Sequence, residues 1–95
     1  LKIIYFGMNF NKSLDMLPES IEEIYLLATF NQPINNLPES ITHIFIGYEF
    51  NQSVDSLPKN LEYIKFGSKF NKSVYLLPQK LKYIIFIQKI ELDFE

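Results

Sequence analysis

Cysteine and tryptophan are absent from the 95 residues, and histidine occurs only once. Without cysteine the chain can form neither a disulfide framework nor a thiolate metal site, so we expect a reducing compartment and thus an intracellular, cytoplasmic location. No apolar run approaches the roughly 20 residues of a membrane span, and no signal-peptide pattern opens the chain. We therefore expect neither a membrane nor a metal among the partners.

The charged residues form no patch of one sign in the sequence. All nine cations are lysines, they are scattered along the chain, and the formal net charge is −2. A basic patch is the electrostatic footprint of a nucleic-acid-binding protein, so we expect no nucleic acid partner. The 47% hydrophobic content nevertheless predicts an ordered domain with its own core.

The feature that organises this chain is an internal repeat. Cutting before each Phe-Asn pair gives four 20-residue units without insertion or deletion, at 10–29, 30–49, 50–69 and 70–89. A partial turn at 1–9 precedes them, and a decayed, more acidic end at 90–95 follows. We interpret 1–95 as a single repeat domain. Because the first residue is already in phase, we expect it to be a fragment of a longer chain.

Six positions of the repeat are apolar in nearly every unit, and we expect them to be buried throughout. Position one is occupied by Leu1, Ile21, Ile41, Leu61 and Leu81, and the other five are positions four, six, ten, fourteen and seventeen. The spacing of positions one, four and six fits a helix starting at the proline of position eighteen as well as a strand. Segments such as 44–47 are β-branched, aromatic and glycine-terminated, which favours a strand.

Twenty residues per turn leave no room for a full helix on the return side. The sequence therefore predicts a β-rich solenoid, namely a right-handed, leucine-rich-repeat-like coil with one short parallel strand per turn and little helix. The strands are expected at 2–6, 22–26, 42–46, 62–66 and 82–86. The alternative fold is a narrow parallel β-helix or another short-turn solenoid.

The recurring motif is Phe-Asn-(Lys/Gln)-(Ser/Pro)-hydrophobic, then Leu-Pro, then Ile/Leu-x-x-Ile-x-Phe-Gly, over essentially residues 1–90. It resembles the FNIP repeat family and, more broadly, a short leucine-rich repeat. The turns are slightly shorter than is usual in that family, position thirteen is serine except at Pro33, and Leu27 and Ile87 replace the glycine of position seven. Because FNIP proteins often carry an F-box, the resemblance implies the substrate-receptor arm of an F-box-type ubiquitin ligase, although these residues contain no F-box.

Two adjacent positions are expected to hold the turns together. An asparagine side chain both accepts and donates hydrogen bonds, so stacked copies can satisfy backbone groups in the bend after each strand. The phenylalanines that precede them are expected to stack as a spine through the core. This structural ladder consists of Asn11, Asn31, Asn51, Asn71, Phe10, Phe30, Phe50 and Phe70. Glycine at position seven permits either a special backbone conformation or a close approach of two turns.

His43 is the one imidazole of the chain and thus the candidate for a general base. His43 occupies outward position three beside Glu23 of the preceding unit, but no serine or cysteine nucleophile stands in a recognisable setting. We interpret His43 as an exposed strand histidine and expect no catalytic, cofactor-binding or metal-binding residues. The protein is accordingly predicted not to be an enzyme. The repeat also produces Asn-x-Ser sequences, which are formal sites of N-glycosylation. An asparagine whose side chain is engaged in a ladder is not expected to be glycosylated.

Positions three and five of each strand should face away from the core, and they are unusually aromatic. We therefore predict a non-catalytic protein-protein interaction module that recognises a protein partner of unknown identity. The predicted partner-binding residues are Tyr5, Tyr25, Phe45, His43, Tyr63, Lys65 and Tyr83. The alternative is that these aromatic side chains only brace adjacent strands. In that case the chain is a structural spacer or a decaying repeat array without a dedicated partner.

Overall fold

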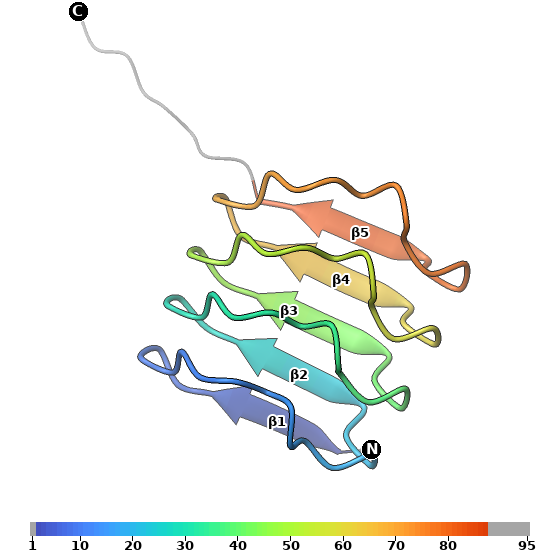
Figure 1. Cartoon of the computed structure of the whole chain (residues 1–95), viewed down its shortest axis with the longest axis horizontal. Helices are drawn as coiled ribbons and strands as arrows, with labels where there is room; N and C mark the ends of the chain where they lie inside the picture. The colour runs from blue at the N-terminus through green and yellow to red at the C-terminus, as the bar shows by residue number, and fades with distance from the viewer. Residues whose placement is uncertain (1, 88–95) are drawn as a thin grey trace, which may run out of the picture.

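The computed structural model describes residues 2–87, which wind into a β-solenoid with one short strand per turn (Figure 1). The strands are β1 (Ile3–Phe6), β2 (Glu23–Leu26), β3 (His43–Ile46), β4 (Tyr63–Phe66) and β5 (Tyr83–Phe86). They form one parallel sheet in the order β1-β2-β3-β4-β5, and residues 2–87 contain no helix. In Figure 1 the strands run leftwards behind and the return segments run rightwards in front as the turns climb, which is a right-handed coil.

The register of the sheet follows the sequence repeat. Ile24 pairs with Ile4 on one side and with Ile44 on the other, so equivalent positions of successive units lie side by side. Each strand begins one residue later than the sequence predicts. The carbonyl of Lys2 accepts from the amides of both Glu22 and Glu23, at 2.9 and 3.1 Å, and this shared acceptor interrupts regular pairing at position two.

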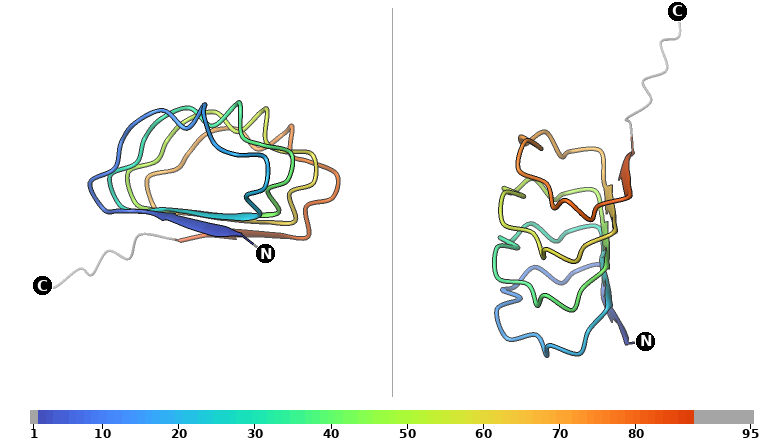
Figure 2. Two further views of the ribbon diagram at one scale, coloured as in Figure 1. Left: turned by 90° about the horizontal axis from the view of Figure 1, so that it is seen from below. Right: turned by 90° about the vertical axis from the view of Figure 1, so that its right-hand side faces the viewer.

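Two tight turns close each coil. After β2, the amide of Phe30 donates to the carbonyl of Leu27 at 3.1 Å, and before β3 the amide of Ile41 donates to the carbonyl of Pro38 at 3.2 Å. Between these turns the chain has no regular secondary structure and makes a further turn at residues 35 and 36, and the leucine before each proline is biased away from the helical region. The return segments therefore arch over the inner face of the sheet, as Figure 2 shows.

The core is a column of apolar side chains that lies between the sheet and the return segments. Its buried members are Leu14, Ile21, Ile24, Leu26, Phe30, Ile34, Leu37, Ile41, Ile44, Ile46, Phe50, Val54, Leu57, Leu61, Ile64 and Phe66. The rings of Phe10, Phe30, Phe50 and Phe70 stack through this column with centroids 6.1 to 6.2 Å apart. In the inner turns, the six predicted positions are all buried.

The prediction of burial throughout is wrong in the outer turns. Val74 and Phe86 are 38% and 47% exposed, although their equivalents Val54 and Phe66 are buried. Both exposed residues belong to the last described turn, which has a described neighbour on only one side. A solenoid side chain is covered by the turn before it and the turn after it, so losing one neighbour exposes part of its surface. The burial predicted for Leu1, and the decayed end predicted at 90–95, lie outside the described residues.

The asparagines form a ladder of hydrogen bonds from turn to turn. The Oδ1 atoms of Asn11, Asn31 and Asn51 each accept from the backbone amide of the next asparagine, at 2.8, 2.8 and 3.0 Å. Each side chain therefore replaces a sheet bond at the bend, where the strand has ended. The last asparagine in the series, Asn71, donates its amide to this ladder.

Glutamine at position twelve also takes part in this ladder. The Nε2 atom of Gln52 lies 3.2 Å from the carbonyl oxygen of Asn31 and 3.1 Å from its Oδ1 atom, and Gln32 makes the same pair of contacts with Asn11. A glutamine amide is long enough to reach back one turn and donate both bonds. The two glutamines are half-buried as a result.

Close approach, and not backbone conformation, explains two of the glycines at position seven, Gly47 and Gly67. No glycine in residues 2–87 has a positive φ. A Cβ atom on Gly67 would lie 2.3 Å from the carbonyl oxygen of Gly47 and 2.8 Å from Cα of Tyr48, both backbone atoms that cannot rotate away. A Cβ atom on Gly7 would meet nothing within 4 Å.

The substitution Gly67→Ala should therefore lower the free energy of unfolding by about 1–3 kcal/mol, because two backbones must separate. Gly7→Ala is the matched control and should leave stability unchanged or slightly raised, since alanine restricts the unfolded chain. Urea unfolding followed by circular dichroism measures both. Equal losses for the two variants would show that the packing of adjacent turns does not select glycine.

Candidate protein-interaction surface

The outer face of the sheet carries the side chains that point away from the core. It comprises Ile3, Tyr5, Glu23, Tyr25, His43, Phe45, Tyr63, Lys65, Tyr83 and Ile85. The strand alternation that buries Ile24 and Leu26 also places Glu23 and Tyr25 outward. At the two ends of the sheet, Tyr5 and Tyr83 are 65% and 64% exposed, whereas the central side chains are half-buried against one another.

Five of these side chains form a continuous aromatic row across the sheet. It consists of Tyr5, Tyr25, Phe45, Tyr63 and Tyr83. Tyr5, Tyr25 and Phe45 stack almost in parallel, with adjacent centroids 4.3 Å apart and interplanar angles of 13° and 3°. This spacing is close to the distance between neighbouring parallel strands, so the backbone itself sets the rings in stacking contact.

The aromatic row changes position between β3 and β4. Phe45 occupies position five, but the equivalent residue of β4 is Lys65, and the row continues through Tyr63 at position three. The ring of Tyr63 lies 5.0 Å from that of Phe45 at an angle of 40°, so the contact is tilted where the earlier ones were stacked. The shift leaves the half-buried Lys65 as the cation on the outer face of the described strands.

Tyr25 is held by a carboxylate on its own strand. Its hydroxyl donates to Oε1 of Glu23 at 3.4 Å. Burial among its neighbours raises the pKa of Tyr25 above its ordinary value of 10.0, and the adjacent Tyr5 and Glu23 raise it further. The hydroxyl therefore stays protonated at neutral pH and remains a donor, which leaves the row uncharged at this point.

His43 sits beside the row without the partners of a catalytic base. Its Nδ1 atom lies 2.9 Å from the hydroxyl of Thr42, and its ring stacks on Tyr63 with centroids 5.7 Å apart. Glu23, whose sequence position made it the candidate orienting group, accepts from the Tyr25 hydroxyl. The structure thus places His43 within an aromatic cluster and next to a threonine. Neither of these contacts is with a carboxylate that could orient the ring as a general base.

A hollow of about 220 Å³ opens on the outer face near the carboxyl ends of β2, β3 and β4. It is lined by Tyr25, Leu26, Leu27, Phe45, Ile46, Gly47 and Lys65. Leu27 and Gly47 were not among the predicted partner-binding residues. The sequence shows that Leu27 at position seven of one turn is followed by Gly47 in the next, but this contrast alone does not predict a hollow.

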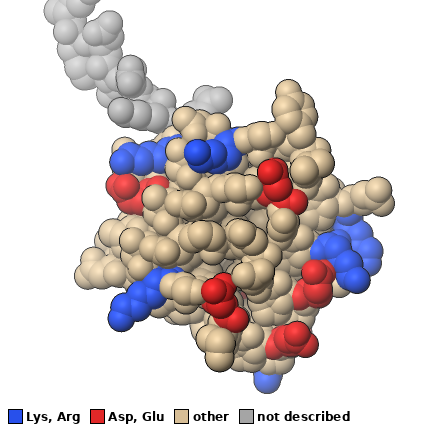
Figure 3. Space-filling model, in the orientation of Figure 1, with Lys and Arg blue, Asp and Glu red and all other residues tan. Residues whose placement is uncertain are grey.

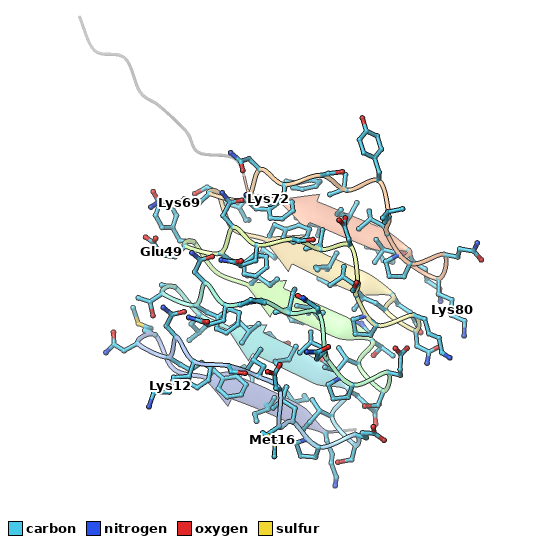
Figure 4. All side chains as sticks on the ribbon, viewed as in Figure 1. Lys12, Met16, Glu49, Lys69, Lys72 and Lys80 are labelled. Carbon is cyan, nitrogen blue, oxygen red and sulfur yellow. The ribbon has the colours of Figure 1, made fainter. Side chains whose placement is uncertain are left out.

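Charged side chains elsewhere pair between turns or project into solvent. Lys69 lies 3.1 Å from Glu49, and Lys82 lies 3.3 Å from Glu62. The side of the return segments carries both signs without a patch of either, as Figure 3 shows. In Figure 4 the labelled Lys69 and Glu49 lie together at the edge where the strands end. Such exposed pairs contribute little stability, but they leave Lys65 distinct as a half-buried cation.

Two other kinds of site, a metal centre and a membrane-spanning helix, do not fit the chemistry of residues 2–87. No group of three or more His, Cys, Asp or Glu side chains in this range could hold a metal ion. The same residues include no helix long and apolar enough to cross a membrane. The outer face, with its aromatic row and hollow, is therefore the feature of the described surface that calls for a functional explanation.

The fold and this surface together define a leucine-rich-repeat-like β-solenoid. The FNIP Repeat profile matches residues 10–49, 30–69 and 50–89, and the chain belongs to this family. The family and the fold predicted from the sequence are thus confirmed. Solenoids of this class are typically non-catalytic scaffolds for protein interactions, because stacked repeats present an extended surface.

A solved structure agrees with this assignment. The crystal structure of CroV588, described as a novel circular LRR protein structure, is 36% identical in sequence and matches with a TM-score of 0.82. The match covers 90% of this chain and 14% of that protein, so the chain spans a small part of its length. No curated protein matches the chain.

Proposed function

We propose that this chain is a non-catalytic recognition module that binds a protein partner on the outer face of its sheet. The observation that carries the proposal is the continuous aromatic row, which crosses five strands on a face that no described segment covers. Contiguous apolar surface that stays exposed marks interaction sites more often than chance placement would. Tyrosine also adds contact area at low cost in side-chain entropy.

Further support comes from the separation of this face from the parts that hold the fold. The core side chains and the asparagine ladder point inward or between turns, whereas the row lies on the opposite side of the strands.

Within the same proposal, an intracellular FNIP protein would use the module as the substrate-receptor arm of an F-box-type ubiquitin ligase. That assignment rests on the family resemblance and is tested by the sequence of the full-length protein, which must then contain an F-box.

The competing function is a structural spacer, and the close ring stacking favours it. Rings that lie 4.3 Å apart in parallel brace adjacent strands whether or not a partner binds. The two functions differ in what happens when the rings are removed. If the rings brace the sheet, their removal lowers the stability of the fold. If they recognise a partner, their removal lowers the affinity for that partner.

The substitutions Tyr25→Ser and Phe45→Ser should each weaken partner binding by about 1–2 kcal/mol, as expected for central residues of an interface. The measurement is a titration with a partner identified through the intact array, beside denaturant melts of the same variants. Tyr75→Ser is the matched control, since this tyrosine is 93% exposed on a return segment and should change neither quantity. Unchanged binding together with a large loss of stability would establish the spacer instead.

A further inference from the structure

The charge of Lys65 has no counterion among the described residues. Ion pairs in residues 2–87 join Lys69 to Glu49 and Lys82 to Glu62, and neither pair includes Lys65. Glu23 is the acidic residue of the outer face, and it lies two strands away with Tyr25 as its donor. A half-buried cation loses part of its hydration, so a carboxylate arriving with a partner gains more here than at a fully exposed lysine.

The hollow beside Lys65 is too small for a whole ligand of the usual kind. Its volume of about 220 Å³ lies below the range of roughly 300–1,000 Å³ that is typical of small-molecule sites. It is suited to one anchoring side chain of a protein. Gly47 and Leu27 line the hollow beside Tyr25 and Phe45, whose rings supply an apolar wall against which another ring can pack.

We propose that the outer face binds an acidic segment of a protein partner, with an aromatic side chain in the hollow and a neighbouring carboxylate paired with Lys65. The chain's net charge of −2 does not oppose this, because charges more than about 10 Å away are largely screened at moderate salt. The inference rests on the proposed function and specifies the chemistry of the partner: an aromatic residue next to aspartate or glutamate.

The test is selection of peptides from a random-peptide display library on the purified chain, followed by titration of the enriched peptides. Enriched peptides should carry an aromatic residue beside at least one acidic residue, and binding should weaken as salt rises. Lys65→Gln should weaken these peptides about tenfold, because a charge-assisted bond at a half-buried site is lost. Lys72→Gln is the matched control, since this lysine is exposed on a return segment, and it should have no effect.

The outcomes separate this inference from the proposed function. Enriched peptides that lose binding in Tyr25→Ser but carry no acidic residue, or that bind Lys65→Gln normally, would overturn the inference and leave the recognition module standing. Peptides unaffected by Tyr25→Ser and Phe45→Ser would overturn both. Enrichment of no peptide at all would count against an anchoring hollow. Melting curves of Lys65→Gln should match those of the unaltered chain, which excludes a folding defect as the cause of lost binding.

Discussion

A chain that lacks residues 30–49 should still fold, with a lower denaturant midpoint but a single cooperative transition. The deletion removes one 20-residue unit in phase, so β4 takes the place of β3 beside β2 with equivalent positions in contact. Each turn of a solenoid touches only its neighbours, and the remaining turns therefore keep the same kind of interface. The asparagine ladder would rejoin, with Asn51 donating its amide to Asn11.

Removing only residues 30–39 should instead abolish cooperative folding. The shortened connection lacks Phe30, Ile34 and Leu37, which are buried in the intact chain, and it can no longer circle the core between β2 and β3. Far-ultraviolet circular dichroism and urea melts of the two deletion variants make the comparison. If the chain tolerated both deletions equally, the stacked, in-phase architecture would not be what stabilises it.

The substitution Phe50→Ala should cost about 3–5 kcal/mol of the free energy of unfolding. Phe50 is fully buried in the middle of the spine, with ring centroids 6.1 Å from Phe30 and 6.2 Å from Phe70. Alanine would remove both contacts and leave a cavity that neighbouring turns, fixed by the sheet, cannot close. A domain of this size has about 5–15 kcal/mol in total, so the expected loss is a large share.

The measurement is again urea unfolding, with Tyr75→Ala as the control. This ring is 93% exposed, and its removal should change stability by less than about 0.5 kcal/mol. If Phe50→Ala does not fold at all, Phe50→Leu keeps most of the apolar volume and should give a smaller, measurable loss. A loss at Phe50 no greater than that at Tyr75 would contradict a continuous core.

The sequence predicts the inner turns well because one signal governs them. An unbroken 20-residue period requires equivalent residues to stack, and the pairing of Ile24 with Ile4 and Ile44 follows from that requirement alone. Exposure of Val74 and Phe86 was missed because the period treats every turn alike, whereas burial depends on how many neighbours a turn has. The predicted strands begin one residue too early for a local reason. The carbonyl group of the residue before the strand accepts two hydrogen bonds from the next turn, and this shared acceptor interrupts the regular pairing.

The candidate site was predicted less completely because it depends on differences between turns. Alternation along the strand is enough to place Tyr25, Phe45 and Lys65 on the outer face. The period says nothing about the shift of the aromatic row from Phe45 to Tyr63, which follows from one lysine standing where an aromatic residue stood. The hollow likewise needs the three-dimensional spacing of Leu27, Gly47 and Lys65. The role of Gln52 was missed because a glutamine's reach to the preceding turn is not visible in one unit.

The alternation within each four-residue strand has an evolutionary consequence. Two side chains of a strand such as His43–Ile46 face the core, and the other two face outward. Substitutions at the two outward positions leave the core volume and the asparagine ladder intact, so these positions can drift while the rest of the unit is held constant. An array of this kind can acquire a new binding preference one strand at a time, with the stacked turns acting as a fixed frame for a variable surface.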